Sequence, residues 1–324
     1  MTDRTQAPPR EIDCKPRSTR AIRSVIAASL VLGLGVACGS PSPPEAPLSP
    51  AEESQAPSVA SDAASPAPPA SSSEARPAAP APCPDGMLHV QHDFCPEMER
   101  KCLKSEYDRS NHITICHRFA EGENTCKTER IKLDFCIDRY EYPNQEGGHP
   151  PVMVSWYDAA GACGALGKRL CYESEWVAAC EGPDEKPFPY GWERSSAKCN
   201  IDNRWISPSL KKIYSSDPAV SEPELRRLDQ SKPSGAMKEC VSDFGVHDLT
   251  GNFDEWALAD RDRPKQRAVF AALKGGAWGH VRNACRPVTT SHEPEFTYYF
   301  VSFRCCSDPN EGSQASTGGG GEAR

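Results

Sequence analysis

The residues best placed to do chemistry stand in the stretch 245–256, which reads GVHDLTGNFDEW. Asp248 and Glu255 flank a Gly251-Asn252 pair, and a tight turn at the glycine would bring both carboxylates and two backbone carbonyls to one point. Oxygen ligands of this kind suit a hard cation such as Ca²⁺. The alternative is a solvated turn held by hydrogen bonds between side chains and backbone, which short Asp and Asn stretches commonly form.

Cysteine is the second residue type that could do chemistry. The chain has 16 cysteines, and setting aside Cys14 and Cys38 leaves 14 between residues 83 and 306. An even, dense set is typical of disulfides in an exported protein, because that compartment is oxidising. A structural zinc site is the weaker alternative, since no Cys-x-x-Cys pair occurs. We therefore expect disulfides, whose pairing the spacing alone does not decide.

Six short motifs follow one another in an order typical of a single family. They are 151–159 (PVMVSWYDA), 167–176 (GKRLCYESEW), 188–191 (FPYG), 245–256 (GVHDLTGNFDEW), 274–278 (KGGAW) and 302–305 (SFRC). Weaker matches at 83–87 and 135–141 extend the series, so that it covers roughly residues 83–306. By these motifs the domain resembles the formylglycine-generating enzyme, or sulfatase-modifying factor, family. The resemblance implies an α+β domain of the irregular C-type-lectin-like kind.

In that family, oxidation depends on two cysteines in the loop after a Gly-Gly motif. They bind copper(I), which suits soft thiolates, and the enzyme then uses oxygen to convert a cysteine of a client sulfatase to formylglycine. The corresponding loop here, residues 275–286, contains only Cys285. An alignment without gaps leaves His280 and Cys285 at the copper positions, a pair that could still hold a soft metal. An alignment with a gap places Cys285 in a structural disulfide, and we favour it because it leaves the cysteine set even.

The resemblance also implies metal and disulfide sites at particular positions. The expected calcium ligands are side-chain oxygens of Asp248 and Glu255, backbone oxygens of Gly251 and Phe253, and Asn200 with Ile201 as part of a second site. The expected disulfides are Cys163–Cys305, and Cys180 with a cysteine at or near Cys285. Calcium at such a site would stiffen the loops without taking part in chemistry.

Two helices must position these loops. Ser155 and Asp158 form a capping-box pattern that predicts a short helix ending before Gly167. A second helix is predicted over roughly residues 173–180, where Tyr172 stands at the cap position and cannot accept the usual short-range amide bond. The rest consists of short apolar runs broken by Gly, Pro and Asp. These runs predict short strands, many turns and long ordered loops in a disulfide-rich domain.

The N-terminus has the pattern of an export signal, which we assign to residues 1–37. Three arginines precede an apolar run of 14 residues, 24–37, which is too short to span a bilayer. The run ends at Cys38, and the preceding residues resemble a bacterial lipobox, although Gly35 departs from its consensus. We therefore expect Cys38 to be lipidated, the alternative being ordinary signal cleavage nearby. The residue after Cys38 is Gly39 and not an acidic residue of the kind that retains a lipoprotein at the inner membrane. This favours the outer membrane.

Composition divides the remainder of the chain. Residues 38–82 form the lipidated cysteine and a linker of mostly Pro, Ala, Ser and Glu, which we expect to be disordered and partly polyproline-like. Residues 83–306 form one domain, and the Gly- and Ser-rich residues 307–324 form a flexible tail. The net charge of −8 and the lack of basic runs with interleaved aromatics argue against nucleic acid as a partner.

We therefore expect an exported cell-envelope lipoprotein whose calcium-stabilised domain binds a protein or glycan or organises the envelope, and is attached to the membrane through Cys38. The alternative is an oxygen-dependent oxidase of a substrate cysteine, with Cys285 holding copper(I) and His280 assisting. Copper belongs only to this alternative. A third possibility, carbohydrate binding on the lectin-like scaffold, would require an open coordination position on calcium.

Overall fold

A computed structural model describes residues 81–261 and 270–310. The expected signal peptide, Cys38, nearly all of the linker and most of the tail lie outside the described residues. Within the described ranges, no helix is long and apolar enough to cross a membrane.

The first sheet has four strands in the order β1-β4-β10-β5. β1 (Met87–Phe94) and β4 (Ile131–Asp138) pair antiparallel over their full lengths, and the C-terminal β10 (Cys305–Ser307) lies between β4 and β5 (Arg169–Leu170). Val90 and Phe94 lie on the same face of β1, because residues four apart in a strand point to the same side, and both are buried. The sheet therefore ties the beginning of the described domain to its end.

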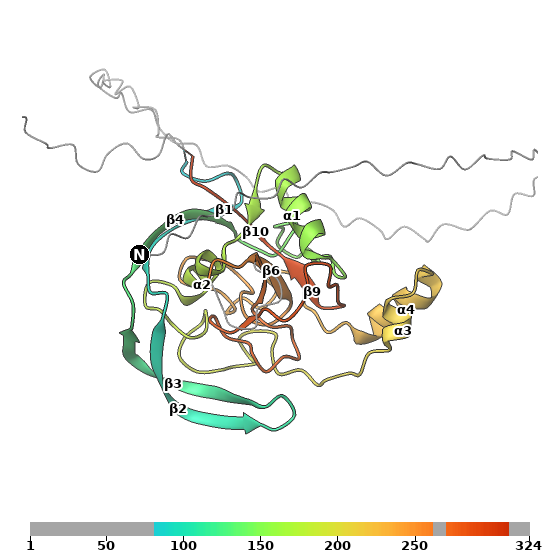
Figure 1. Cartoon of the computed structure of the whole chain (residues 1–324), viewed down its shortest axis with the longest axis horizontal. Helices are drawn as coiled ribbons and strands as arrows, with labels where there is room; N and C mark the ends of the chain where they lie inside the picture. The colour runs from blue at the N-terminus through green and yellow to red at the C-terminus, as the bar shows by residue number, and fades with distance from the viewer. Residues whose placement is uncertain (1–80, 262–269, 311–324) are drawn as a thin grey trace, which may run out of the picture. The chain divides into compact units, whose positions relative to one another are not determined.

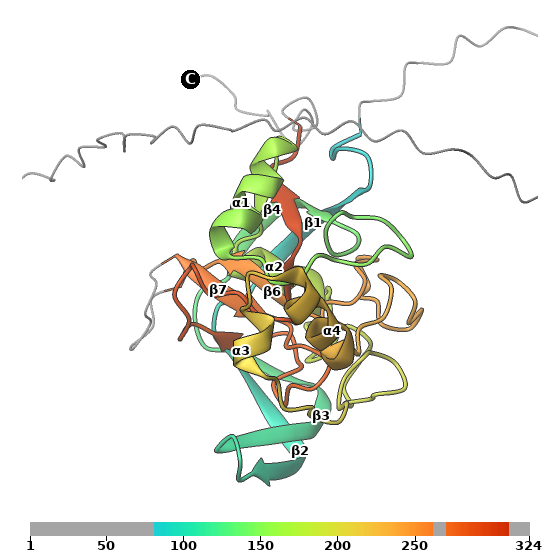
Figure 2. The same cartoon turned by 90° about the vertical axis from the view of Figure 1, so that its right-hand side faces the viewer.

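A second sheet is a long two-stranded hairpin of β2 (Met98–Asp108) and β3 (Ile113–Cys126). In Figures 1 and 2 it lies at the opposite end of the described domain from α1. Its strands have 11 and 14 residues, which is longer than the short strands that the sequence predicted. The Cys95–Cys126 disulfide closes the base of the hairpin, and Cys102–Cys116 joins its strands further out.

The third sheet has the order β8-β7-β6-β9, with bounds Val288–Thr289, Ala271–Lys274, Asp254–Leu258 and Val301–Phe303. β6 pairs antiparallel with β7 and parallel with β9. Every residue of β7 and β9 is buried, so this sheet lies in the interior. It carries Glu255 into the core, beside Trp256.

Helices α1 (Trp156–Ala165) and α2 (Glu173–Glu181) lie where the sequence predicted them. Ser155 caps α1: its hydroxyl accepts from Asp158 N at 3.1 Å, and the Asp158 carboxylate accepts from Ser155 N at 2.9 Å. Tyr172 provides no side-chain cap for α2. Glu175 compensates in part, because its Oε2 accepts from the Tyr172 amide at 2.9 Å.

Two further helices, α3 (Leu210–Ile213) and α4 (Pro218–Leu228), were not predicted from the sequence. Asp217 caps α4 by accepting from the Ala219 amide at 2.9 Å, and Pro218 follows at the first helical position, where a missing amide proton costs nothing. Leu228 and Ile213 are buried in the main core, and the Tyr214 hydroxyl donates to the Thr297 carbonyl at 2.7 Å. These contacts attach the helical pair to the domain.

All 14 cysteines of the described residues form disulfides. The pairs are Cys83–Cys136, Cys95–Cys126, Cys102–Cys116, Cys163–Cys305, Cys171–Cys306, Cys180–Cys285 and Cys199–Cys240. The two pairs that the resemblance implied, Cys163–Cys305 and Cys180–Cys285, are confirmed. The adjacent Cys305 and Cys306 have separate partners, so β10 is linked to both α1 and the turn before α2.

Candidate functional site

The stretch around Glu255 contributes one partner of a buried ion pair. Arg304, between β9 and β10, donates through Nε and Nη2 to the two oxygens of Glu255 at 2.7 and 2.6 Å. Trp176 of α2 donates its indole N–H to Glu255 Oε2 at 2.8 Å. All three side chains are buried, and such bidentate, charge-assisted bonds are short and directional. Both oxygens of the Glu255 carboxylate are therefore already engaged by donors.

Asp248 lies in a second buried cluster with Glu141. Its Oδ2 accepts from the Gly235 amide at 2.6 Å, and burial raises the pKa of Asp248 to about 6. Burial, followed by repulsion from Asp248, raises the pKa of Glu141 to about 8. Glu141 accepts from Ser234 Oγ at 2.6 Å and from Asn252 Nδ2 at 2.8 Å. Glu141, Asp248 and Glu255 thus place more carboxyl groups in the interior than the single guanidinium of Arg304 can neutralise.

The structure places Asn200 and Ile201, the expected second calcium segment, next to the turn at Gly251 and Asn252. Asn200 Nδ2 donates to Asn252 Oδ1 at 3.1 Å, and the Asn200 carbonyl accepts from the Asn252 amide at 3.0 Å. Gly251 has φ of +82°, and a Cβ there would overlap the Asn200 carbonyl oxygen. Ile201 is buried against the Cys199–Cys240 disulfide. A glycine is therefore required where the two segments meet.

The side chains as they lie do not fit the expected calcium set at Glu255. A calcium ion bound by Glu255 would have to displace the Arg304 guanidinium or share the carboxylate with it. Within the described part of the chain, no group of three or more His, Cys, Asp or Glu side chains is arranged to hold a metal ion. Gly251 and Phe253 shape the buried loop, while Asp248 accepts from the Gly235 amide.

The loop expected to carry copper contains no free thiol. Cys285 is fully buried and bonded to Cys180 of α2, as the alignment with a gap implied. His280 lies elsewhere in the loop, with its Nδ1 at 3.0 Å from Asp254 Oδ2 and its ring edge-on to Phe300 at 4.6 Å between centroids. A disulfide sulfur cannot serve as a thiolate ligand. The chain as folded therefore does not fit copper(I) at the His280–Cys285 pair.

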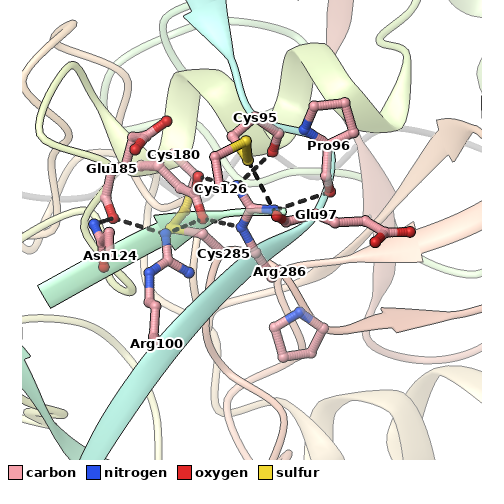
Figure 3. Close-up of polar contacts among 12 residues, drawn as sticks. Cys95, Pro96, Glu97, Arg100, Asn124, Cys126, Cys180, Glu185, Cys285 and Arg286 are labelled. Atoms are coloured by element: carbon pink, nitrogen blue, oxygen red, sulfur yellow. Dashed lines mark hydrogen bonds and ion pairs between the residues drawn. A yellow bond between two sulfur atoms is a disulfide. The ribbon is translucent and has the colours of Figure 1, made fainter. Parts of the chain in front are cut away.

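Arginine side chains fix this loop to the hairpin and to α2. Arg286 donates to the Glu181 carboxylate at 2.6 and 2.8 Å and to the carbonyls of Cys95 and Pro96, as Figure 3 shows for the last two. Arg100 of β2 donates to the same Glu181 at 2.6 Å. Glu181 is thereby shared between two arginines in a buried setting, which holds the residues after Cys285 against the base of the hairpin.

Two neighbouring cavities lie between the hairpin and this loop. One, of about 490 Å³, is lined by Ser110, Asn111, Ile113, Trp205, Gly279, His280, Val281 and Arg282. The other, of about 320 Å³, has a largely apolar lining that includes Ile115, Phe119, Pro187 and Phe188. Ile113, Val281 and Arg282 line both cavities. Of the residues that the sequence singled out, only His280 lines the larger cavity, and Cys285 lines neither.

Sequence reasoning missed Trp205, Arg282 and the hairpin turn at Ser110 and Asn111. Trp205 lies in a loop without a recognisable motif, and the hairpin turn is more than 90 positions upstream of it. The available signal was the polar composition of β2, which reads MERKCLKSEYD and indicates a strand with little burial. That signal does not say which loop the hairpin faces.

These features define a disulfide-rich α+β domain with few helices and three small sheets. The family model of the sulfatase-modifying factor enzyme 1-like domain matches residues 115–309, which is more than half of the chain. The chain therefore belongs to the sulfatase-modifying factor family. β1, β2 and the hairpin turn precede the matched residues.

Similar proteins include both active and inactive members. The chain is 29% identical over 178 residues to the formylglycine-generating enzyme of Thermomonospora curvata, covering 52% of this chain and 54% of that protein. It is 28% identical over 165 residues to the inactive C-alpha-formylglycine-generating enzyme 2 of Bos taurus, covering 49% and 50%. The chain thus spans about half the length of these two relatives.

Two solved structures align with most of the described domain at low sequence identity. CarF aligns with a TM-score of 0.44 and 15% identity, covering 69% of this chain and 98% of that chain. PvdO from Pseudomonas aeruginosa aligns with a TM-score of 0.38 and 15% identity, covering 68% and 94%.

Proposed function

We propose that this chain is a non-oxidising member of the sulfatase-modifying factor family that acts as a binding domain in the cell envelope. The observation that carries the proposal is the Cys180–Cys285 disulfide, which uses the one cysteine of the loop that corresponds to the copper loop. Oxidation of a substrate thiol through copper(I) needs thiolate ligands, and every cysteine of the described residues is bridged.

The surroundings of the disulfide support the same proposal. Cys285 is fully buried, and its amide donates to the Pro187 carbonyl at 3.0 Å. The next residue, Arg286, is held by Glu181 on α2, the helix that also carries Cys180. Opening the disulfide would leave its sulfur atoms enclosed by these contacts. The bridge therefore has the character of a structural disulfide and not of a reactive one.

The N-terminal sequence supports the proposed location in the cell envelope. A basic and apolar signal-like segment ends at Cys38, and about 44 residues rich in Pro, Ala and Ser separate that cysteine from the domain. We propose that Cys38 carries the lipid anchor, with the outer membrane favoured. An oxidising compartment also suits a domain with seven disulfides.

The test is a disulfide map of the full chain produced by export and purified in detergent. Free thiols are alkylated before reduction, and the peptides are identified by mass spectrometry. We expect a peptide pair joined by Cys180–Cys285 and no alkylated cysteine between residues 83 and 306. Intact mass of the N-terminal peptide reports whether Cys38 carries acyl chains. An alkylated Cys285 in the folded chain would contradict the proposal.

An activity measurement completes the test. The chain is loaded with copper(I), incubated in air with a cysteine-containing sulfatase peptide, and the peptide mass is followed for conversion of the thiol to an aldehyde. We expect no conversion. The same conversion is measured for two variants. Cys180→Ser releases the Cys285 thiol, and Cys102→Ser, the control, releases a thiol in the hairpin instead. Conversion by the unmodified chain would establish the oxidase alternative and refute our proposal.

A further inference from the structure

The larger cavity beside the hairpin turn combines an exposed indole with polar side chains. Trp205 is 52% exposed, and an atom of its six-membered ring lies 4.0 Å from the position that a Cβ on Gly279 would occupy. The indole therefore lies in contact range of the loop at Gly279. Ser110 and Asn111 come from the hairpin turn, and His280 and Arg282 come from the loop after β7. A volume of about 490 Å³ lies in the range of small-molecule sites.

Arg282 supplies positive charge to this cavity. Within residues 81–261 and 270–310 it makes no hydrogen bond or ion pair, whereas the other arginines along the two cavities are engaged. Arg194 pairs with Asp202 at 2.6 Å, and Arg100 and Arg286 both pair with Glu181. A guanidinium in a concave, partly buried site is suited to bind a carboxylate through two parallel N–H···O bonds. The unpaired positive charge of Arg282 therefore favours an anionic ligand.

The other residues that line the cavity indicate which class of anionic ligand it would bind. An exposed indole offers a flat apolar face, which suits the C–H face of a sugar ring, and the polar groups around it suit hydroxyls. Arg282 is the one arginine or lysine among the described residues that line this cavity, so it is the side chain available to pair with an anionic ligand. A peptide with a large apolar side chain would instead be expected to fill the smaller cavity, where Phe119 and Phe188 lie.

We propose that the larger cavity binds a sugar that carries a carboxylate, with the ring stacked on Trp205 and the carboxylate paired with Arg282. The inference rests on the proposed function as a binding domain and names its ligand class. It requires no calcium, unlike the carbohydrate binding that a lectin-like scaffold suggests from sequence. The hairpin forms one wall of the site, so its position must be fixed.

The backbone does fix the hairpin near this loop. The amide of Phe119 donates to the Trp192 carbonyl at 3.0 Å, and the amide of Arg194 donates to the His117 carbonyl at 2.8 Å. Arg194 also donates to the carbonyls of Asn283 and His280, at 3.0 and 3.3 Å. The hairpin is thereby connected through one arginine to the loop that carries Arg282. The two walls of the cavity belong to one hydrogen-bonded unit.

The experiment uses the exported full chain in detergent and an oligomer of galacturonic acid as the probe. Binding is measured by calorimetry and by the change in tryptophan fluorescence. We expect binding by the parent chain and at least a ~10-fold weaker affinity for its methyl ester, which keeps the sugar ring and removes the charge. Arg282→Gln and Trp205→Ala should each weaken binding of the acid ~10-fold or more.

Two control variants test whether losing an arginine or an aromatic residue elsewhere on the surface changes the measured affinity. Arg226→Gln removes an exposed arginine on α4, and Tyr157→Ala removes an exposed aromatic residue on α1; both should retain the parent affinity. Thermal unfolding and the disulfide map check that each variant is folded. A glutamate hexapeptide serves as the acidic-peptide probe.

The inference would be overturned by no binding of the oligomer at millimolar concentration, by equal binding of its methyl ester, or by tighter binding of the peptide. If these occur while Cys180–Cys285 is bridged, the ligand class is wrong and the non-oxidising function still stands. A free Cys285 would refute the proposed function by itself. Sugar binding that survives both Arg282→Gln and Trp205→Ala would place the ligand at another surface and also overturn the inference.

Discussion

Replacing Arg304 by methionine should cost the domain a large part of its stability. Methionine keeps an unbranched apolar stem but is shorter and has no guanidinium, so the buried Glu255 carboxylate loses the two bonds, at 2.6 and 2.7 Å, that neutralise it. Attraction to Glu255 is the strongest influence raising the pKa of Arg304 against burial, and Glu141 and Asp248 add to it, so one guanidinium serves three acids. Removing one partner of a buried pair typically costs about 3–5 kcal/mol.

The matched control is Arg226→Met on α4. That arginine pairs with Glu222 at 3.1 Å, but both side chains are largely exposed, and such pairs contribute roughly 0–1 kcal/mol. Guanidinium unfolding with disulfides intact gives the free energy of each variant from the midpoint and slope. The double variant Arg304→Met/Glu255→Gln should lose less than the sum of the single changes. An Arg304→Met midpoint equal to that of Arg226→Met would refute the assignment of this pair as the centre of the buried network.

Three further outcomes follow from the same core. Because the pKa of Glu141 is raised from 4.5 to about 8, the folded chain binds the proton more tightly than the unfolded chain, so stability should fall as pH rises from about 5 to 8. Glu141→Gln should flatten this slope in melting temperature, and an unchanged slope would contradict the assignment. Gly251→Ala, at φ +82° and against the Asn200 carbonyl, should destabilise by roughly 3 kcal/mol in denaturant, whereas Gly161→Ala, in α1 with open space around it, should not destabilise. Since Arg304 already neutralises Glu255, EGTA should leave the melting temperature within about 2 °C, and a larger drop would reveal a calcium ion that this side-chain arrangement does not accommodate.

The sequence predicted the parts of the fold that depend on local signals. The capping box at Ser155 and Asp158 and the glycine after α1 are determined by neighbouring residues, so the helix bounds were nearly correct. The disulfides Cys163–Cys305 and Cys180–Cys285 came from family resemblance, because partners 142 and 105 residues apart cannot be paired by spacing. The motif around Glu255 was recognised, but its partner was not. Arg304 reaches Glu255 from 49 positions away, and no local pattern indicates that a guanidinium occupies that carboxylate.

The hairpin was missed for a different physical reason. β2 is largely exposed, so it lacks the alternation of apolar and polar residues that marks a half-buried strand. Two disulfides join the two sides of the hairpin to each other, and the Arg100–Glu181 pair and backbone bonds to Trp192 and Arg194 hold it against distant parts of the domain. A cavity assembled from its turn, from the Trp205 loop and from the loop after β7 therefore has no signature in any one segment.

If the domain is a non-oxidising binding domain, as we propose, the same arrangement accounts for how the loop presents a site without a thiol. The Cys180–Cys285 disulfide and the Arg286–Glu181 pair fix the end of the loop on α2, while Arg194 holds the backbone at His280 and Asn283. A loop held at both ends can present Arg282 in a defined position without a metal to organise it. Binding by this cavity should therefore depend on the integrity of the Cys180–Cys285 bridge. Cys180→Ser should weaken binding of the galacturonic acid oligomer, whereas Cys83→Ser, which opens a disulfide near β1 and β4, should not. Equal binding by the two variants would show that the bridge does not position Arg282.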